Sequence, residues 1–159
     1  MALATLLGTS ALVRADDQPY VAAPLTRPGE FTKGIEGPSC DGEGNVYAVN
    51  FAREGTIGKV DPGTGRGEVF VTLTGTSVGN GIVFDRQGRM YVADYVGHNV
   101  LRVDMPSRKI VVFAHAAMKQ PNDVAIAPDD TIYASDPDWT NGTGQVWKVS
   151  TGGEIERKK

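Results

Sequence analysis

Three polar residues recur at a regular spacing and carry oxygen atoms that could bind a hard cation. Glu36, Asn80 and Asn122 stand 44 and 42 residues apart, and we call them the lead residues. Carboxylate and amide oxygens suit calcium, which takes roughly 6–8 oxygen ligands in a flexible shell. If each repeat aims its lead residue at one axis, these oxygens converge on a single site. For Asn80 and Asn122, the alternative is that each amide caps a strand by bonding backbone groups.

Each lead residue opens the same phrase. A tyrosine follows eleven positions later, and an asparagine or aspartate follows fourteen positions later. A period in the range of roughly 40–50 residues is typical of the four-stranded blades of a propeller. The recurrence of the fourteenth residue favours a structural role at the end of a second strand over three catalytic acids. These residues are Tyr47, Tyr91 and Tyr133, followed by Asn50, Asp94 and Asp136.

The middle repeat shows the strands of one blade most clearly. Branched and aromatic residues are concentrated over 81–84, 89–93, 99–103 and 109–113, with apolar and polar residues alternating in 99–103 and a turn at 85–88. The sequence therefore predicts an all-β fold, a β-propeller with blades over about 36–72, 80–114 and 122–157 within a domain spanning 28–159.

Three blades cannot close a ring, because a propeller closes with typically 4–8 blades. We expect the chain to be the N-terminal half of a six-bladed ring, completed by a missing C-terminal half or, alternatively, by a second copy. Residues 29–31 are similar to the start of the outer strand at 67–70, and we expect them to form an outer strand for a blade that this chain does not contain.

Composition argues for an ordinary globular domain and against nucleic acid as a partner. The chain is 40% hydrophobic and 22% charged, and its net charge of −3 offers no basic surface. The single cysteine, Cys40, excludes an intramolecular disulfide, and its place in the first inner strand predicts a small buried side chain. His98 and His115 have no metal-binding spacing and are expected to be ordinary surface residues.

The N-terminus is apolar, but too short to span a bilayer, so no membrane partner is expected. Residues 1–15 resemble a secretory signal peptide, and residues 16–27 read as a proline-containing linker. These features favour a periplasmic or secreted protein. The alternative is a misplaced start codon or a disordered leader on a cytoplasmic protein.

The phrases around the lead residues resemble a known family. The segments 36–38, 80–82, 120–124 and 133–137 are similar to those of gluconolactonases, regucalcin (senescence marker protein) and related hydrolases, and the resemblance covers about 28–157. It implies a six-bladed propeller with calcium, or another divalent cation, in its central channel. It matches Glu36 to the acidic metal ligand of the first blade and Asn122 to an asparagine that binds metal or substrate.

The sequence thus predicts a calcium-dependent hydrolase that opens small lactones such as sugar lactones. The expected metal ligands are Glu36 and Asn122, and the expected substrate contacts are Asn80, Asp123 and Trp139. Asp123 could instead orient its neighbour or form a turn, and Trp139 lies in a predicted rim loop. The resemblance implies that the remaining ligands, and the general base or nucleophile, come from blades that are absent here. The alternatives are a noncatalytic binding or scaffold propeller and an inactive fragment.

Overall fold

The protein is all-β over residues 21–158, the part that the computed structural model describes. Within these residues there is no helix, and hence none that could cross a membrane. The predicted signal peptide and the first part of the predicted linker lie outside the described residues. The strands are β1 Ser39–Cys40, β2 Val46–Val49, β3 Thr56–Val60, β4 Gly67–Thr72, β5 Gly79–Phe84, β6 Met90–Asp94, β7 Asn99–Asp104, β8 Lys109–His115, β9 Val124–Ile126, β10 Ile132–Asp136, β11 Gln145–Val149 and β12 Ile155–Lys158.

The strands form three antiparallel sheets of four strands each. Each sheet runs in chain order, β1 to β4, β5 to β8 and β9 to β12, so every sheet is a simple meander. Tight turns join the strands, as where Asp85 Oδ1 accepts hydrogen bonds from the N–H groups of Gln87 and Arg89, both at 2.9 Å. Gly88 completes that turn with φ of 75°, a conformation that a residue with a side chain rarely adopts. We call the sheets blades 1, 2 and 3.

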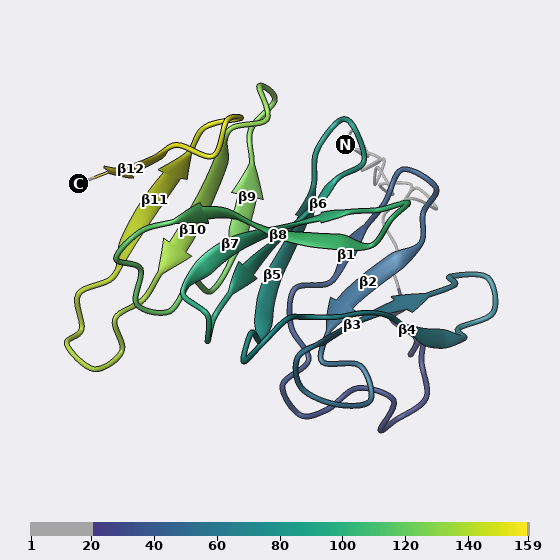
Figure 1. Ribbon diagram of the computed structural model, residues 1–159. Helices are drawn as coiled ribbons and strands as arrows, with labels where there is room; N and C mark the ends of the chain where they lie inside the picture. The colour runs from purple at the N-terminus through teal and green to yellow at the C-terminus, as the bar shows by residue number, and fades with distance from the viewer. Residues whose placement is uncertain (1–20, 159) are drawn as a thin grey trace, which may run out of the picture.

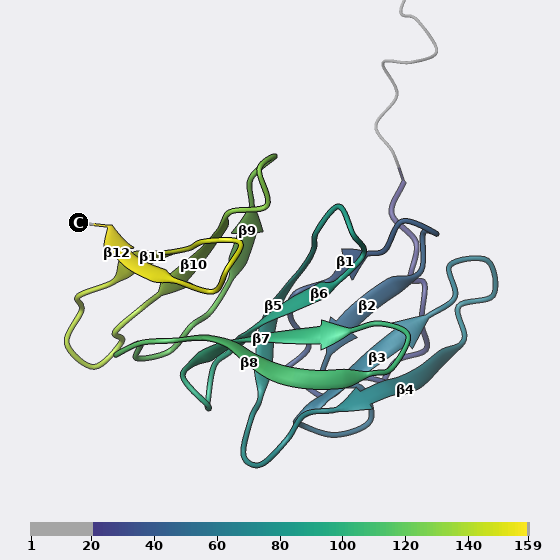
Figure 2. The ribbon, with the colours of Figure 1, turned by 45° about the horizontal axis from the view of Figure 1, so that its top comes forward.

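The blades pack face to face through their inner strands. Strand β5 lies beside both β1 and β2 of blade 1, while β9 of blade 3 lies beside β5 and β6. Figures 1 and 2 show the three sheets fanned out in chain order, from blade 1 at the right to blade 3 at the left. This arrangement places the starts of the three inner strands next to one another.

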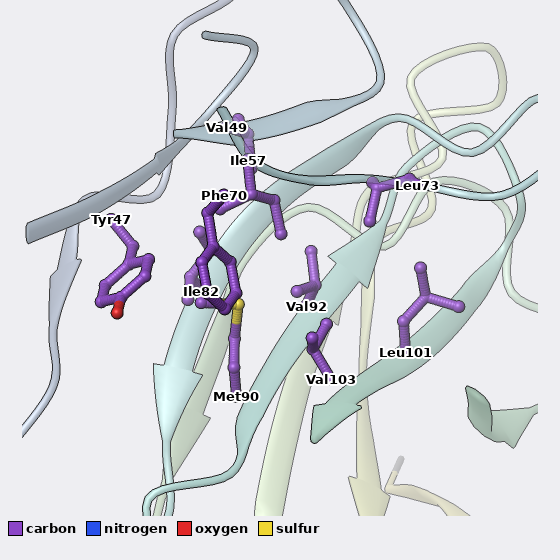
Figure 3. Packing of buried hydrophobic residues seen from close by; sticks show 10 residues of the cluster. All are labelled: Tyr47, Val49, Ile57, Phe70, Leu73, Ile82, Met90, Val92, Leu101 and Val103. Carbon is purple, nitrogen blue, oxygen red and sulfur yellow. The ribbon is translucent and has the colours of Figure 1, made fainter. Parts of the chain in front are cut away.

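The core between blades 1 and 2 is apolar and tightly filled (Figure 3). Tyr47 of β2 packs edge-on against Phe70, with ring centroids 5.2 Å apart. It also packs against the tilted ring of Phe84 in the next blade, with ring centroids 5.3 Å apart. Met90 and Val92 are fully buried in the same cluster. Burying a side chain of this size contributes about 1.5–3 kcal/mol, so this interface fixes the angle between the two blades.

The second interface repeats the first, but blade 3 has no neighbour on its far side. Tyr91 packs against Phe113 at 4.9 Å and lies in a cluster with Val124 and Trp147 of blade 3. Tyr47 and Tyr91 are 1% and 2% exposed, whereas Tyr133, at the same position of blade 3, is 37% exposed. The equivalent face of blade 3 is therefore open in the described chain.

Two expectations drawn from the sequence are wrong. Cys40 is exposed rather than buried, because its strand is the inner strand of blade 1 and no blade among residues 21–158 packs against that side of it. Residues 29–31 do not form an outer strand for another blade. Phe31 instead makes a single antiparallel bridge to Phe51 of blade 1, with the two rings edge-on at 5.0 Å.

Candidate functional site

The lead residues lie at equivalent positions where the inner strands begin. Asn80 belongs to β5, while Glu36 and Asn122 come just before β1 and β9. Backbone hydrogen bonds continue the ladder through them: Val49 N–H donates to the carbonyl of Glu36 at 3.2 Å, and Asn122 N–H donates to the carbonyl of Ser135 at 2.9 Å. The backbone at the site is therefore as well ordered by hydrogen bonds as the sheets themselves.

The lead residues of neighbouring blades are adjacent because glycine follows them in blades 1 and 2. Gly37 lies directly against the backbone of Asn80, and a side chain at Gly37 would collide with the Asn80 carbonyl. Gly81 N–H donates to the carbonyl of Asn122 at 2.8 Å. The three lead residues thus form one continuous row across the blades, which we call the lead row.

The side chains of the lead row are not used by the fold. Glu36 is exposed, and Asn80 and Asn122 are half-buried. Among residues 21–158, no hydrogen bond or ion pair engages the carboxylate of Glu36 or the side-chain amides of Asn80 and Asn122. The two amides therefore make none of the backbone bonds that a strand-capping role requires.

The residues fourteen positions later behave in the opposite way. Asp94 is fully buried and accepts hydrogen bonds from Ser77 Oγ at 2.7 Å and Val78 N–H at 3.2 Å. Asp136, 1% exposed, accepts from Gln120 N–H at 2.6 Å and from the Trp147 indole N–H at 2.7 Å.

Asn50 does the same in blade 1, where its Nδ2 donates to the carbonyl of Gly34 at 2.6 Å. In each blade, the bonded backbone group belongs to the residue two positions before the lead residue. The structural role predicted for Asn50, Asp94 and Asp136 is confirmed, and we call these three the anchoring residues. Their function is to hold the chain that leads into the lead row.

The electrostatics of Asp136 reflect this engagement. Burial raises the pKa of its carboxyl group, but hydrogen bonds from the Gln120 backbone and from Trp147 and Gln145 outweigh burial, so the pKa lies below its ordinary value. The carboxylate is therefore charged in the folded protein and satisfied entirely by protein donors. A group engaged in this way is poorly placed to bind a cation or to take up a proton.

Asp123 and Trp139, the other predicted site residues, differ in how closely they approach the lead row. Asp123 stands where blades 1 and 2 have glycine, and its carboxylate lies against Gly81. Its Oδ1 accepts from the N–H of Val124 at 2.8 Å, which leaves its second oxygen without a protein partner among the described residues. Trp139 is 69% exposed. The structure brings Asp123 to the lead row and leaves Trp139 on a loop.

The loop that carries Trp139, residues 137–144, is held by hydrogen bonds to Asp138. Asp138 Oδ2 accepts from Asn141 Nδ2 at 2.8 Å and from Thr143 Oγ1 at 3.2 Å. The loop starts at Asp136, which is bonded to the segment just before Asn122, so it lies at the same end of the blade as the lead row. It therefore lies beside the lead row, and we call it the rim loop after the channel-rim position that the sequence predicts for it.

The donor chemistry of the lead row fits a hard divalent cation, but the number of donors does not fill its shell. Glu36 offers a carboxylate, and Asn80 and Asn122 offer amide carbonyls. Among residues 21–158, no group of three or more histidine, cysteine, aspartate or glutamate side chains could hold a metal ion. Because calcium takes roughly 6–8 oxygens, further ligands would have to come from water, a substrate or other blades.

Two features of the site were missed in the sequence. One is the role of Gly37 and Gly81, although a glycine directly after two of the lead residues was a visible signal. The other is the pairing of each anchoring residue with the residue sixteen positions before it, which carries no signature because the group bonded there is a backbone atom in all three blades.

The geometry can be compared with that of known proteins. A solved gluconolactonase from Xanthomonas campestris superimposes with a TM-score of 0.66 at 18% identity, covering 82% of this chain and 48% of its own. The chain has the fold of the part of that protein that it covers. Regucalcin from Agrobacterium tumefaciens, described as calcium-binding, matches with a TM-score of 0.62 at 17% identity, covering 77% of this chain and 42% of that one.

The same fold also occurs in an enzyme of another kind. Virginiamycin B lyase from Staphylococcus aureus matches with a TM-score of 0.64 at 17% identity, covering 79% of this chain and 41% of the lyase. No family model matches the chain, and no curated protein matches it in sequence. The chain thus spans less than half the length of these three structures, and the likeness establishes its fold.

Proposed function

We propose that the three blades form half of a closed, six-bladed ring and that the lead row faces its central channel. The row would bind calcium, or another divalent cation, and the completed site would hydrolyse small lactones. The observation that carries the proposal is the unengaged state of Glu36, Asn80 and Asn122 on adjacent strands, beside anchoring residues that are fully bonded. Polar side chains that the fold does not use, placed in a row by residues that it does use, indicate a ligand.

Within this site, Glu36 and Asn122 would hold the cation and Asn80 would bind substrate. The cation supplies positive charge that polarises an ester carbonyl and stabilises negative charge developing on its oxygen. The free oxygen of Asp123 would accept a hydrogen bond from a substrate hydroxyl, and the rim loop would place Trp139 against one face of the ring. We assign no general base to residues 21–158, since the anchoring carboxylates are already satisfied by protein donors.

Calcium binding is the first experiment, because it tests the lead row directly. A cation that binds only the folded chain stabilises it by RT ln(1 + [L]/Kd), about 2.7 kcal/mol at one hundred times Kd. We expect the melting temperature to rise with calcium and to fall back with chelator. The Glu36→Gln and Asn122→Ala variants should lose that rise, and Glu54→Gln, an exposed carboxylate on the loop between β2 and β3, should keep it. Equal melting with calcium and with chelator would contradict the proposal and favour a noncatalytic propeller.

Lactone hydrolysis is the second experiment. Opening a lactone releases a proton, so a pH indicator reports turnover of a sugar lactone directly. We expect calcium-dependent turnover above the spontaneous rate by the protein in which the ring is complete, with Glu36→Gln inactive. Calcium binding without turnover of any small lactone would retain the metal site and reject the hydrolase.

We also propose that the protein is exported, because residues 1–15 have the composition of a signal peptide. The mass of the mature protein recovered from its native host tests this. Cleavage near residue 15 would support export, and a full-length N-terminus in the cytoplasm would contradict it.

A further inference from the structure

The open face of blade 3 carries a set of side chains that the other two blades bury. Tyr133 pairs with Ala125 across β9 and β10, and Ser135 pairs with Val146 across β10 and β11, so all four lie on one face. Tyr133 and Val146 are 37% and 45% exposed. With Asp123, these residues line a shallow hollow of about 230 Å³, which we call the Tyr133 face.

The internal repeat shows what covers such a face. Tyr47 is covered by Phe84, which comes from the inner strand of the next blade, four positions after its lead residue. Tyr91 is covered in the same way, since Ile126, four positions after Asn122, packs against its cluster. The residue four positions after a lead residue is therefore the one that closes the preceding blade.

Blade 1 carries this covering position on its own free face. Cys40, four positions after Glu36, pairs in register with Val46. Since Val46 and Tyr47 point to opposite faces of the strand and Tyr47 faces blade 2, Cys40 faces away from blade 2. It is exposed, as is Val69, which lies on the same free face at 42%. The ring of Phe51 lies against Gly58 and Gly67, so the chain covers the outer part of this face itself and leaves the part around Cys40 open.

We propose that the Tyr133 face is an interface for a second copy of this chain, whose blade 1 docks on it around Cys40. The chain itself carries the complementary surface, because Cys40 stands at the covering position on the exposed face of blade 1. Each copy offers one face of each kind, and a two-fold axis therefore joins two chains through two identical contacts and leaves neither face open. The interface stands on the packing of the blades and does not depend on the proposed lactonase activity.

Sedimentation velocity of the full chain over a range of concentrations, in the presence of EDTA, tests the proposal. We expect a species of twice the 16.9 kDa of one chain. Tyr133→Asp places a charge at the centre of the interface and should weaken dimerisation about 30-fold or more, the effect of losing a central interface residue. Val112→Asp, on β8 at 58% exposure and away from this face, should leave the dimer intact. Circular dichroism of both variants shows that they fold.

Cross-linking gives a second and independent measurement. Cys40 is the only cysteine, and Ala125→Cys adds one thiol to the Tyr133 face with little change in volume. A short bismaleimide should then join two chains into a covalent dimer on a denaturing gel, and Cys40→Ser in the same background should abolish that product. A monomer at every concentration would overturn the proposal, leaving a further segment of polypeptide to cover the face. A dimer that Tyr133→Asp leaves unchanged and that does not cross-link would also overturn it. Because EDTA removes calcium, the dimer is tested without the metal. Failure of the dimer proposal can therefore be distinguished from failure of the proposed calcium site.

Discussion

The lead residues and the anchoring residues are polar, recur at one offset and lie within the same repeats, yet they are used in opposite ways. Asp136 is buried and bonded to four donor groups. Asn122, which opens the same phrase, makes no side-chain hydrogen bond among the described residues. A recurring polar residue is therefore not evidence of function by itself. A structural polar residue differs from a candidate site residue in that the fold already provides hydrogen-bond partners for its side chain.

Removal of an anchoring carboxylate should give the largest effect. Asp136→Ala would leave the buried indole N–H of Trp147 and the partly buried N–H groups of Lys119 and Gln120 without their acceptor. We expect a loss of about 3 kcal/mol in the free energy of unfolding, measured by urea denaturation. Asp138→Ala, which disturbs only the exposed rim loop, is the control and should change stability little. Equal losses for the two variants would break the distinction between anchoring and other acids.

Acid should weaken the fold through two buried carboxylates, the anchoring residue Asp136 and the turn residue Asp85. Burial raises the pKa of Asp85, but hydrogen bonds from the backbone and the guanidinium of Arg89 outweigh burial, with Arg89 Nε 2.6 Å from Asp85 Oδ2. The pKa values of Asp85 and Asp136 therefore both lie below the ordinary value for aspartate. The folded chain then binds protons less readily than the unfolded chain. The stabilisation is fully present above about pH 4, the unfolded value, and is lost as pH falls through the lower folded values. Urea midpoints from pH 6 to pH 2 check this, and Asp136→Asn should flatten the decline.

Asn50 allows a finer test within the anchoring set. It is neutral and makes two backbone bonds, to the carbonyl of Gly34 and from the N–H of Gly55. Asn50→Ala should therefore cost less than Asp136→Ala, about 1–2 kcal/mol by urea denaturation. A cost as large as that of Asp136→Ala would mean that charge is not what makes the buried acids matter.

The smallest effect on stability is expected in the lead row. Because the side chains of Glu36 and Asn122 make no hydrogen bond or ion pair with residues 21–158, Glu36→Gln and Asn122→Ala should leave the urea midpoint nearly unchanged in the presence of chelator. The same variants should fail to gain stability when calcium is added. A marked loss of stability in chelator would instead make the lead residues structural and remove the reason for placing a ligand there.

Much of the fold could be predicted because a blade is a local object. The alternation of residues in 81–113 and the Asp–Gly turn at 85–88 predict one meander, and the period predicts three of them. Partners outside a blade are harder to predict. Cys40 was expected to be buried because the pattern of an inner strand says nothing about whether a neighbouring blade is present. Phe31 was expected to belong elsewhere, and it folds back on Phe51 by a contact that no repeat encodes.

The sequence predicts which residues form the candidate site and that they converge on one axis, but it does not predict the contacts that make them adjacent. The lead residues and the structural role of Asp94 and Asp136 follow from their offsets. Their adjacency does not, since it depends on Gly37 and Gly81 meeting the backbone of the next blade. Whether a side-chain amide is bonded or free also depends on distances of a few ångströms between blades, which spacing in the sequence does not determine.

The contact of Gly37 with the backbone of Asn80 has a consequence for how such a protein can diversify. Main chain touches main chain there, so the distance between neighbouring lead positions is set by atoms that every residue shares. Exchange of glutamate for asparagine at a lead position can then retune charge and ligand preference without shifting the frame around it. Replacement of the glycine would do the reverse: it would separate the blades while leaving the lead side chains themselves unchanged.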